Sequence, residues 1–130
     1  MADSKTLSLT ERHGLIAISE FLRIIAEADF PVVVSNKNIS YYNVPAAFDI
    51  EVSSFYQNGE KKACMYVWQF GILNWVTYGR TWEEFKLFMS VLSTILGLGE
   101  NLRLPVYVHN LAYEFQFIRK HFTWDKVFFL

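Results

Sequence analysis

The pair Asn58-Gly59 constrains the fold more than any other feature of the sequence, because it marks a tight turn between two apolar stretches. Both residues tolerate the positive φ angles that two-residue hairpin turns need. Residues 46–56 before the turn and residues 63–70 after it therefore predict two antiparallel strands. Gly71 and a further apolar stretch, residues 72–78, add a third. The sequence thus predicts a meander of three antiparallel strands.

An amphipathic helix is predicted ahead of this meander. Its apolar side chains recur at helical spacing until Asp29-Phe30-Pro31 stops the pattern, and Ser8 or Thr10 can cap its start. A short β-branched run, residues 32–34, then predicts a further strand. The apolar positions of the helix are Leu15, Ile18, Phe21, Leu22 and Ile25.

A second helix follows the meander, beginning at the capping box of Thr81 and Glu84 and ending at Gly97. Residues 104–108 predict a buried strand, followed by a loop and by a final helix over about residues 113–121. A strand reached through a helical crossover lies parallel to an earlier strand, and a right-handed connection is favoured. We therefore expect an α/β fold with a mixed sheet: three antiparallel strands, a helix, a parallel strand and flanking helices. This order is typical of the opening half of an RNase H-like sheet.

Composition limits the class of protein. The chain has 130 residues, enough for one compact domain with a core. Hydrophobic residues make up 52% and aromatic residues 18%, more than a small monomer hides easily, so we expect apolar surface that faces a partner. The formal net charge of −1 gives no bulk sign of a nucleic-acid or membrane binder, so any nucleic-acid contact is expected to be local.

The N-terminal sequence and cysteine content indicate a cytoplasmic protein. Cys64 is the single cysteine, which excludes an internal disulfide and a cysteine-cluster metal site, and we interpret it as a small core residue. The first residues lack the basic flank and apolar stretch of a signal peptide. Because no apolar run approaches the ~18 residues of a membrane span, we expect no membrane association.

Three carboxylates form the candidate site. In an extended strand, Asp49 and Glu51 project from the same face, roughly 7 Å apart along the chain. In an RNase H-like sheet, acids on the first strand and near the end of the fourth converge, which would bring Glu114 to the same place. Such a cluster suits a divalent-metal phosphodiesterase. The alternative is that Asp49 and Glu51 are ordinary solvent-facing residues of an edge strand.

Two motifs resemble a known family. The segment FDIE at residues 48–51 resembles the first exonuclease motif of family B DNA polymerases, and HNLAYEF at residues 109–115 resembles the second, in the form found in the protein-primed phage polymerases. The segments VWQFGI at residues 67–72 and TWEEF at residues 81–85 resemble the connecting region of phage members. The resemblance covers roughly residues 45–130 and implies the RNase H-like fold of DnaQ-like exonucleases, with residues 1–44 as an N-terminal helix and lead-in.

The resemblance implies a metal site for 3′-5′ exonuclease activity on single-stranded DNA. Asp49 and Glu51 match the family's metal-binding carboxylates, which with a further acid hold two Mg²⁺ or Mn²⁺ ions. Glu114 stands where many members carry an aspartate. The ions activate water and stabilise the departing 3′ oxygen during removal of the terminal nucleotide.

The same resemblance implies residues that hold the 3′ end of the DNA. Asn110 and Tyr113 match positions that bind the single strand by hydrogen bonding and by aromatic packing, and His109 lies beside them. Val52 stands where the family places a threonine that touches the substrate, and Ser53 is the nearby hydroxyl.

The resemblance also predicts an incomplete site. The family's third exonuclease motif, a tyrosine and an aspartate three residues beyond it, has no match up to Leu130, and no polymerase palm is present. We therefore expect the N-terminal part of an exonuclease domain, with weak metal binding and slow hydrolysis.

Three functional classes follow. The first is a fragment, or one half of a split gene, of a phage-type exonuclease whose remaining ligands lie on another segment. The second is a catalytically inactive protein that binds nucleic acid or a protein through exposed apolar surface, such as a small phage-encoded inhibitor of a host nuclease or defence complex. The third is an unrelated α/β fold. The acids kept at all three positions favour the first, and a phage-encoded protein would act in the host cytoplasm.

Overall fold

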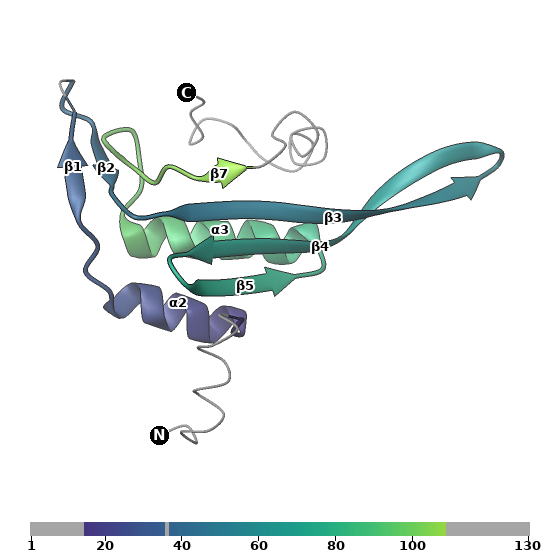
Figure 1. Ribbon diagram of the computed structural model, residues 1–130, viewed down its shortest axis with the longest axis horizontal. Helices are drawn as coiled ribbons and strands as arrows, with labels where there is room; N and C mark the ends of the chain where they lie inside the picture. The colour runs from purple at the N-terminus through teal and green to yellow at the C-terminus, as the bar shows by residue number, and fades with distance from the viewer. Residues whose placement is uncertain (1–14, 36, 109–130) are drawn as a thin grey trace, which may run out of the picture.

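A four-stranded mixed sheet forms the centre of the molecule in the computed structural model, which describes residues 15–35 and 37–108 (Figure 1). Its strand order is β5-β4-β3-β7. Strands β3 (Ala46–Gln57), β4 (Glu60–Ile72) and β5 (Trp75–Gly79) form the predicted antiparallel meander. Strand β7 (Tyr107–Val108) pairs with β3 and runs parallel to it. The α/β class and the parallel fourth strand are therefore confirmed.

The turn at Asn58-Gly59 has the predicted geometry, with φ angles of 53° and 78°. Pairing continues up to Gln57 and Glu60, so the hairpin is longer than the sequence predicted. Its outer part, residues 53–64, projects beyond the body of the molecule as an exposed two-stranded arm (Figure 1). Cys64 lies on this arm and is exposed, so the interpretation of Cys64 as a core residue was wrong. Here the hairpin extends beyond the ends of the helices, and no other described residue covers it.

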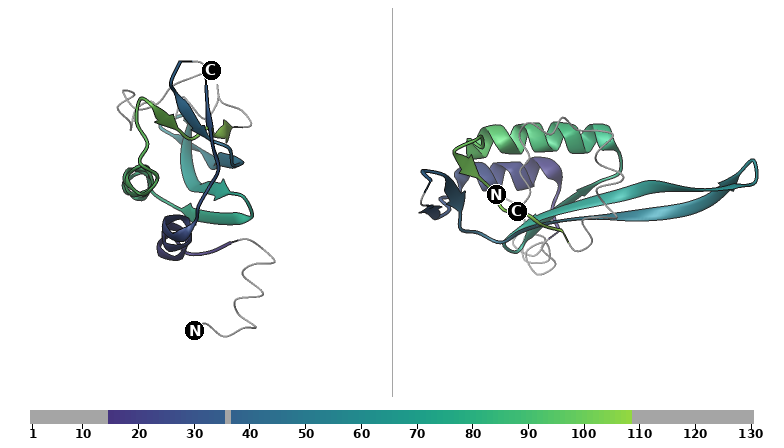
Figure 2. Two further views of the ribbon diagram at one scale, coloured as in Figure 1. Left: turned by 90° about the vertical axis from the view of Figure 1, so that its left-hand side faces the viewer. Right: turned by 90° about the horizontal axis from the view of Figure 1, so that it is seen from above.

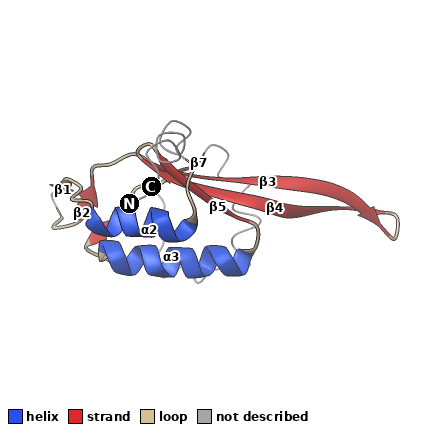
Figure 3. Ribbon diagram, turned by 90° about the horizontal axis from the view of Figure 1, so that it is seen from below, coloured by secondary structure: helices blue, strands red, loops and turns tan. Residues whose placement is uncertain are grey.

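Two helices, α2 (Ile18–Glu27) and α3 (Trp82–Leu96), lie side by side on one face of the sheet (Figures 2 and 3). Side chains on β3 alternate between buried and exposed over Ala46–Glu51, as expected for a strand with one covered face. Among the buried side chains, Phe21 and Ile25 come from α2, and Phe85, Phe88, Leu92 and Leu96 come from α3. None of the described helices is long and apolar enough to cross a membrane.

The fully buried Trp68 lies at the centre of an aromatic core between β4 and α3. Its ring centroid is 4.9 Å from that of Phe85 and 5.2 Å from that of Phe88. The indole N–H donates to the carbonyl oxygen of Thr81 at 3.0 Å, so the polar atom of the ring is satisfied. Trp68 also lies directly opposite Gly79 on β5.

Gly79 is required because the Trp68 ring fills the space where a side chain would start. A Cβ built at position 79 would lie 2.4 Å from Cζ2 of Trp68. We expect Gly79→Ala to lower the free energy of unfolding by about 1–3 kcal/mol, the usual cost of overpacking a core. The measurement is urea unfolding followed by tryptophan fluorescence.

Gly99→Ala is the matched control, because a Cβ at position 99 meets nothing within 4 Å and the residue has no positive φ. We expect its unfolding free energy to stay within about 0.5 kcal/mol of wild type. Equal stabilities of the two variants would contradict the packing of Trp68 against Gly79.

The predicted capping box at the start of α3 is present. The Thr81 hydroxyl accepts from the backbone N–H of Glu84 at 3.1 Å, and a Glu84 carboxylate oxygen accepts from the backbone N–H groups of Arg80 and Thr81 at 2.9 and 3.0 Å. These bonds, chiefly the one from Arg80 N–H, lower the pKa of Glu84 from its ordinary value of 4.5. The helix ends at Gly97, whose left-handed conformation has φ 66°.

The lowered pKa of Glu84 makes part of the stability depend on pH. A carboxyl with a lowered pKa in the folded state stabilises it above the unfolded-state pKa, and this contribution is lost as pH falls through the folded-state value. We expect Glu84→Gln to be less stable than wild type at neutral pH, with a difference that shrinks as pH falls below the ordinary carboxyl pKa of 4.5. Thermal unfolding at several pH values measures this, and Glu83→Gln, a change in the same helical turn, is the control. A difference that does not vary with pH would contradict the charged hydrogen bonds of Glu84.

Helix α2 begins at Ile18, after the predicted helical position Leu15. Leu15 lies outside α2 and forms a parallel β-bridge with Val76, and the backbone N–H of Ile16 donates to the Val76 carbonyl at 2.8 Å. The prediction of Leu15 as a helical residue was therefore wrong. The free edge of β5 offers backbone groups that this segment satisfies. Ser8 and Thr10, the predicted caps, lie outside the described residues.

A second, three-stranded sheet of order β1-β2-β6 was not predicted as a whole. Strand β1 (Val32–Val34) is the predicted β-branched run, and it pairs antiparallel with β2 (Ser40–Tyr42). Strand β6 (Leu102–Arg103) pairs parallel with β2. Tyr42 ties this sheet to α3 by donating to the Leu96 carbonyl at 2.6 Å.

The strand predicted over residues 104–108 is shorter and less buried than expected. Only Tyr107 and Val108 form β7, and Tyr107 is exposed. Pro105 has no N–H to donate to a neighbouring strand, which explains why pairing begins after it. The predicted loop at residues 109–110 and the helix at about residues 113–121 lie outside the described residues.

Candidate functional site

Asp49 and Glu51 lie on the face of the sheet opposite the two helices, here called the outer face. Both side chains are exposed, whereas Phe48 before Asp49 and Ile50 between the two acids are buried on the helix side. The predicted projection of the two acids from one face is therefore present. Within the described part of the chain, no side chain forms a hydrogen bond with Asp49.

On the outer face, each acid lies level with side chains of the neighbouring strands, which together form a row across the sheet. Asp49 pairs with Gln69 on β4, and Gln69 pairs with Tyr78 on β5. Glu51 pairs with Val67. Because Gly79 pairs with Trp68, the next residue, Arg80, lies level with Val67 just beyond the end of β5.

The spacing of the strands sets the distance between the acids and the β5 side chains. Neighbouring strands are about 4.8 Å apart, so Tyr78 lies two spacings from Asp49, roughly 10 Å between backbones. The first row is Asp49, Gln69 and Tyr78, and the second is Glu51, Val67 and Arg80.

A β-bulge brings Tyr66 to Glu51. The register shifts between Glu51 and Val52, which pair with Val67 and Met65 and leave Tyr66 without a partner on β3. The Tyr66 hydroxyl donates to Oε2 of Glu51 at 2.9 Å. The negative charge of the accepting carboxylate holds the proton, so this hydrogen bond raises the pKa of Tyr66 above 10.0.

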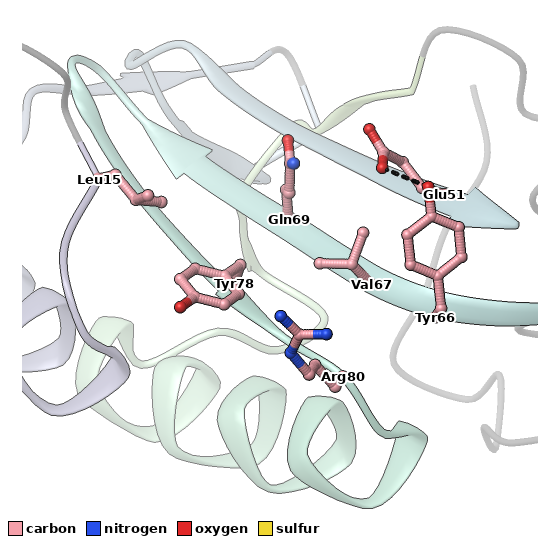
Figure 4. Close-up of a pocket in the computed structure, with 7 residues that line it drawn as sticks. All are labelled: Leu15, Glu51, Tyr66, Val67, Gln69, Tyr78 and Arg80. Carbon is pink, nitrogen blue, oxygen red and sulfur yellow. Dashed lines mark hydrogen bonds between the residues drawn. The ribbon is translucent and has the colours of Figure 1, made fainter.

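These side chains border a hollow of about 330 Å³ on the outer face, here called the outer-face hollow (Figure 4). One carboxylate, one guanidinium, one amide and two phenol rings surround it. Its lining residues are Leu15, Glu51, Tyr66, Val67, Gln69, Tyr78 and Arg80. The hollow therefore combines polar, aromatic and aliphatic side chains, with charges of both signs.

Most of the residues predicted for the site lie outside the described residues: Glu114, His109, Asn110 and Tyr113. The structure does place Val108, the last described residue before them. Val108 pairs with Phe48, the neighbour of Asp49. Ser53 lies on β3 two residues beyond Glu51, where the arm begins, and is exposed.

The acid pair supplies a partial set of metal ligands. Carboxylate oxygens suit Mg²⁺ and Mn²⁺. Over residues 15–35 and 37–108, no group of three His, Cys, Asp or Glu side chains is arranged to hold a metal ion. The hydrogen bond from Tyr66 engages one oxygen of Glu51. Asp49 and Glu51 thus have the right donor chemistry, but further ligands are needed for firm binding.

Four residues that border the hollow were not predicted from the sequence: Tyr66, Gln69, Tyr78 and Arg80. Counting back from the Asn58-Gly59 turn without a bulge would pair Asp49 with Trp68, one residue away from its true partner. No feature of the sequence marks the bulge. The burial of Thr77, which places Tyr78 on the outer face, is seen only in the structure, because the polar Thr77 between Val76 and Tyr78 predicts the opposite alternation.

Comparison with known proteins found no match to this chain among protein-family models, curated proteins or solved structures.

The hydrogen bond between Tyr66 and Glu51 can be tested by titration. We expect Tyr66 to deprotonate above pH 10 in the wild type and at a lower pH in Glu51→Gln, because the neutral amide removes the negative charge that holds the proton. NMR of ¹³C-labelled tyrosine rings follows each residue separately. Tyr56 on the arm is the internal reference, and an unchanged Tyr66 titration in Glu51→Gln would contradict the contact.

Proposed function

We propose that this chain is an exonuclease-type domain with a partial RNase H-like fold, which binds the 3′ end of single-stranded DNA and holds Mg²⁺ or Mn²⁺ at Asp49 and Glu51. The strand order supports the fold assignment. An antiparallel meander followed by a helix and a strand parallel to the first meander strand is the order expected of the opening half of that sheet.

One observation carries the proposal: the acid pair lies on the open face of β3, beside the point where β7 ends. Val108, the residue before the second motif, pairs with Phe48, the neighbour of Asp49, although the two are 60 positions apart in sequence. In this arrangement Glu114, Asn110 and Tyr113 belong to the segment that follows. A pair of acids at an unrelated position on the sheet would give no such proximity.

The residues have distinct roles in the proposed site. Asp49 and Glu51 would hold the metal through carboxylate oxygens, and Glu114 would add a third acid. A bound divalent ion supplies Lewis acidity and a more acidic water at the scissile phosphate. Tyr66 orients the Glu51 carboxylate through its hydrogen bond and leaves the second oxygen free.

Metal binding and strand trimming test the proposal. We expect weak Mn²⁺ binding, measured by electron paramagnetic resonance, and slow Mn²⁺-dependent shortening of a 5′-labelled single strand from its 3′ end, resolved on a denaturing gel. Both are expected to fall by about tenfold or more in Asp49→Ala and Glu51→Gln, because each removes a charged ligand. Glu60→Gln, an acid on the exposed arm, is the control.

The outcomes separate the elements of the proposal. Mn²⁺ binding that persists in Asp49→Ala would exclude the acid pair as the metal site. Rapid degradation that disappears in Asp49→Ala would show that the site is complete, contrary to the expectation of slow hydrolysis.

A protein-binding role is the second candidate, and the edge strand β1 favours it. Its three valines, Val32–Val34, are all exposed. An exposed apolar edge strand is a template for pairing with another chain. The metal experiment distinguishes the two candidates. In a binding protein without catalysis, Asp49→Ala would cause no loss of Mn²⁺ binding or of strand trimming relative to wild type.

A further inference from the structure

We infer that the outer-face hollow is a subsite for single-stranded DNA upstream of its 3′ end, in which Tyr78 stacks on a base and Arg80 binds a backbone phosphate. This inference rests on the proposed function and extends it to residues of β5 and of the turn that follows it. Neither residue belongs to the two motifs that carry the acids.

Tyr78 and Arg80 lie level with the two acids across the sheet. Tyr78 lies in the same cross-strand row as Asp49, and Arg80 lies in the row of Glu51. Both are roughly 10 Å from the acids across the sheet, estimated from two strand spacings. A single strand whose end lies at the acids therefore reaches the hollow within a few nucleotides.

The hollow offers an aromatic ring and a cation to a single strand. The Tyr78 side chain is on the open face and its residue is 42% exposed, so a ring is available for stacking. Base–aromatic stacking combined with a cation for the backbone is the usual way of binding a single strand. Arg80 and Tyr78 border the same hollow (Figure 4), so one nucleotide can contact both.

The backbone of Arg80 is fixed, while the residue remains exposed. The backbone N–H of Arg80 donates to Glu84 at 2.9 Å, which fixes the backbone at the start of α3. Within the described part of the chain, Arg80 forms no salt bridge, and the salt bridges there belong to Arg23. The charge of Arg80 is near enough to Glu84 to help lower the pKa of that carboxyl. Gln69 lies between Tyr78 and Asp49 and offers an amide to a base or a phosphate.

The experiment measures binding without metal, so that it does not depend on catalysis. A fluorescein-labelled oligothymidylate of about eight nucleotides, within the range of single-strand site sizes, is titrated with the full chain in EDTA and followed by fluorescence anisotropy. We expect Tyr78→Ala to weaken binding by about fivefold or more, the lower end of the contribution of one stacked base. Tyr78→Phe keeps the ring and is expected to bind like wild type.

The salt dependence separates the two contacts. We expect Arg80→Ala to weaken binding and to reduce the slope of log affinity against log salt by about 0.7, the value for one phosphate of a single strand. Tyr78→Ala is expected to leave the slope unchanged, because a neutral ring releases no counterion. Arg80→Lys keeps the charge and is expected to keep the slope.

Two matched controls lie away from the hollow. Tyr56→Ala removes an exposed tyrosine from the arm, and Lys86→Ala removes an exposed cation from α3 on the other face. We expect both to bind like wild type. Circular dichroism and thermal unfolding confirm that each variant is folded, and the substituted side chains are all exposed.

The inference fails if Tyr78→Ala and Arg80→Ala bind like wild type, if the controls lose as much affinity, or if the wild-type chain binds no oligothymidylate. An unchanged salt slope in Arg80→Ala removes the phosphate contact. Mn²⁺ binding at Asp49 is measured separately from oligothymidylate binding. The two experiments therefore show whether the subsite, the metal site or both are absent.

Discussion

The packing of Trp68 is the interaction on which the rest of the structure depends. Its ring fills the space above Gly79, contacts Phe85 and Phe88, and donates to the Thr81 carbonyl. Aromatic pairs of this kind contribute about 0.5–1.5 kcal/mol each beyond the burial of their area. This one residue therefore joins β4, the end of β5 and the start of α3, and it fixes the turn that carries Arg80.

The bulge at Tyr66 makes this core compatible with the candidate site. A shift of one residue in register exchanges the two faces of a strand. Without the extra residue on β4, Asp49 would lie opposite Trp68, and the core face of one strand would meet the outer face of the other. The same bulge leaves Tyr66 free to hydrogen-bond Glu51. One irregularity thus serves both the packing and the outer face.

Local signals predicted much of the fold. The Asn58-Gly59 turn, the capping box at Thr81 and the stop at Gly97 predicted the meander and α3, because each acts through nearby backbone geometry. Contacts distant in sequence were missed, namely the bridge at Leu15 and the sheet that joins β2 to β6. The exposure of Cys64 on the arm was missed as well. In this sheet an apolar strand residue is buried where a helix covers it. The local sequence pattern does not predict how far the arm extends beyond the helices.

The sequence by itself determined the chemistry of the candidate site and the strand that carries it, because alternation along a strand places Asp49 and Glu51 on one face whatever the rest of the chain does. Only the tertiary structure decided what lies beside them. The pairing of Val108 with Phe48 brings the end of β7 next to Asp49, and the bulge sets Gln69, Tyr78 and Arg80 level with the acids. Register between strands depends on how side chains such as Trp68 pack against residues of other elements. No single segment of the sequence contains that information.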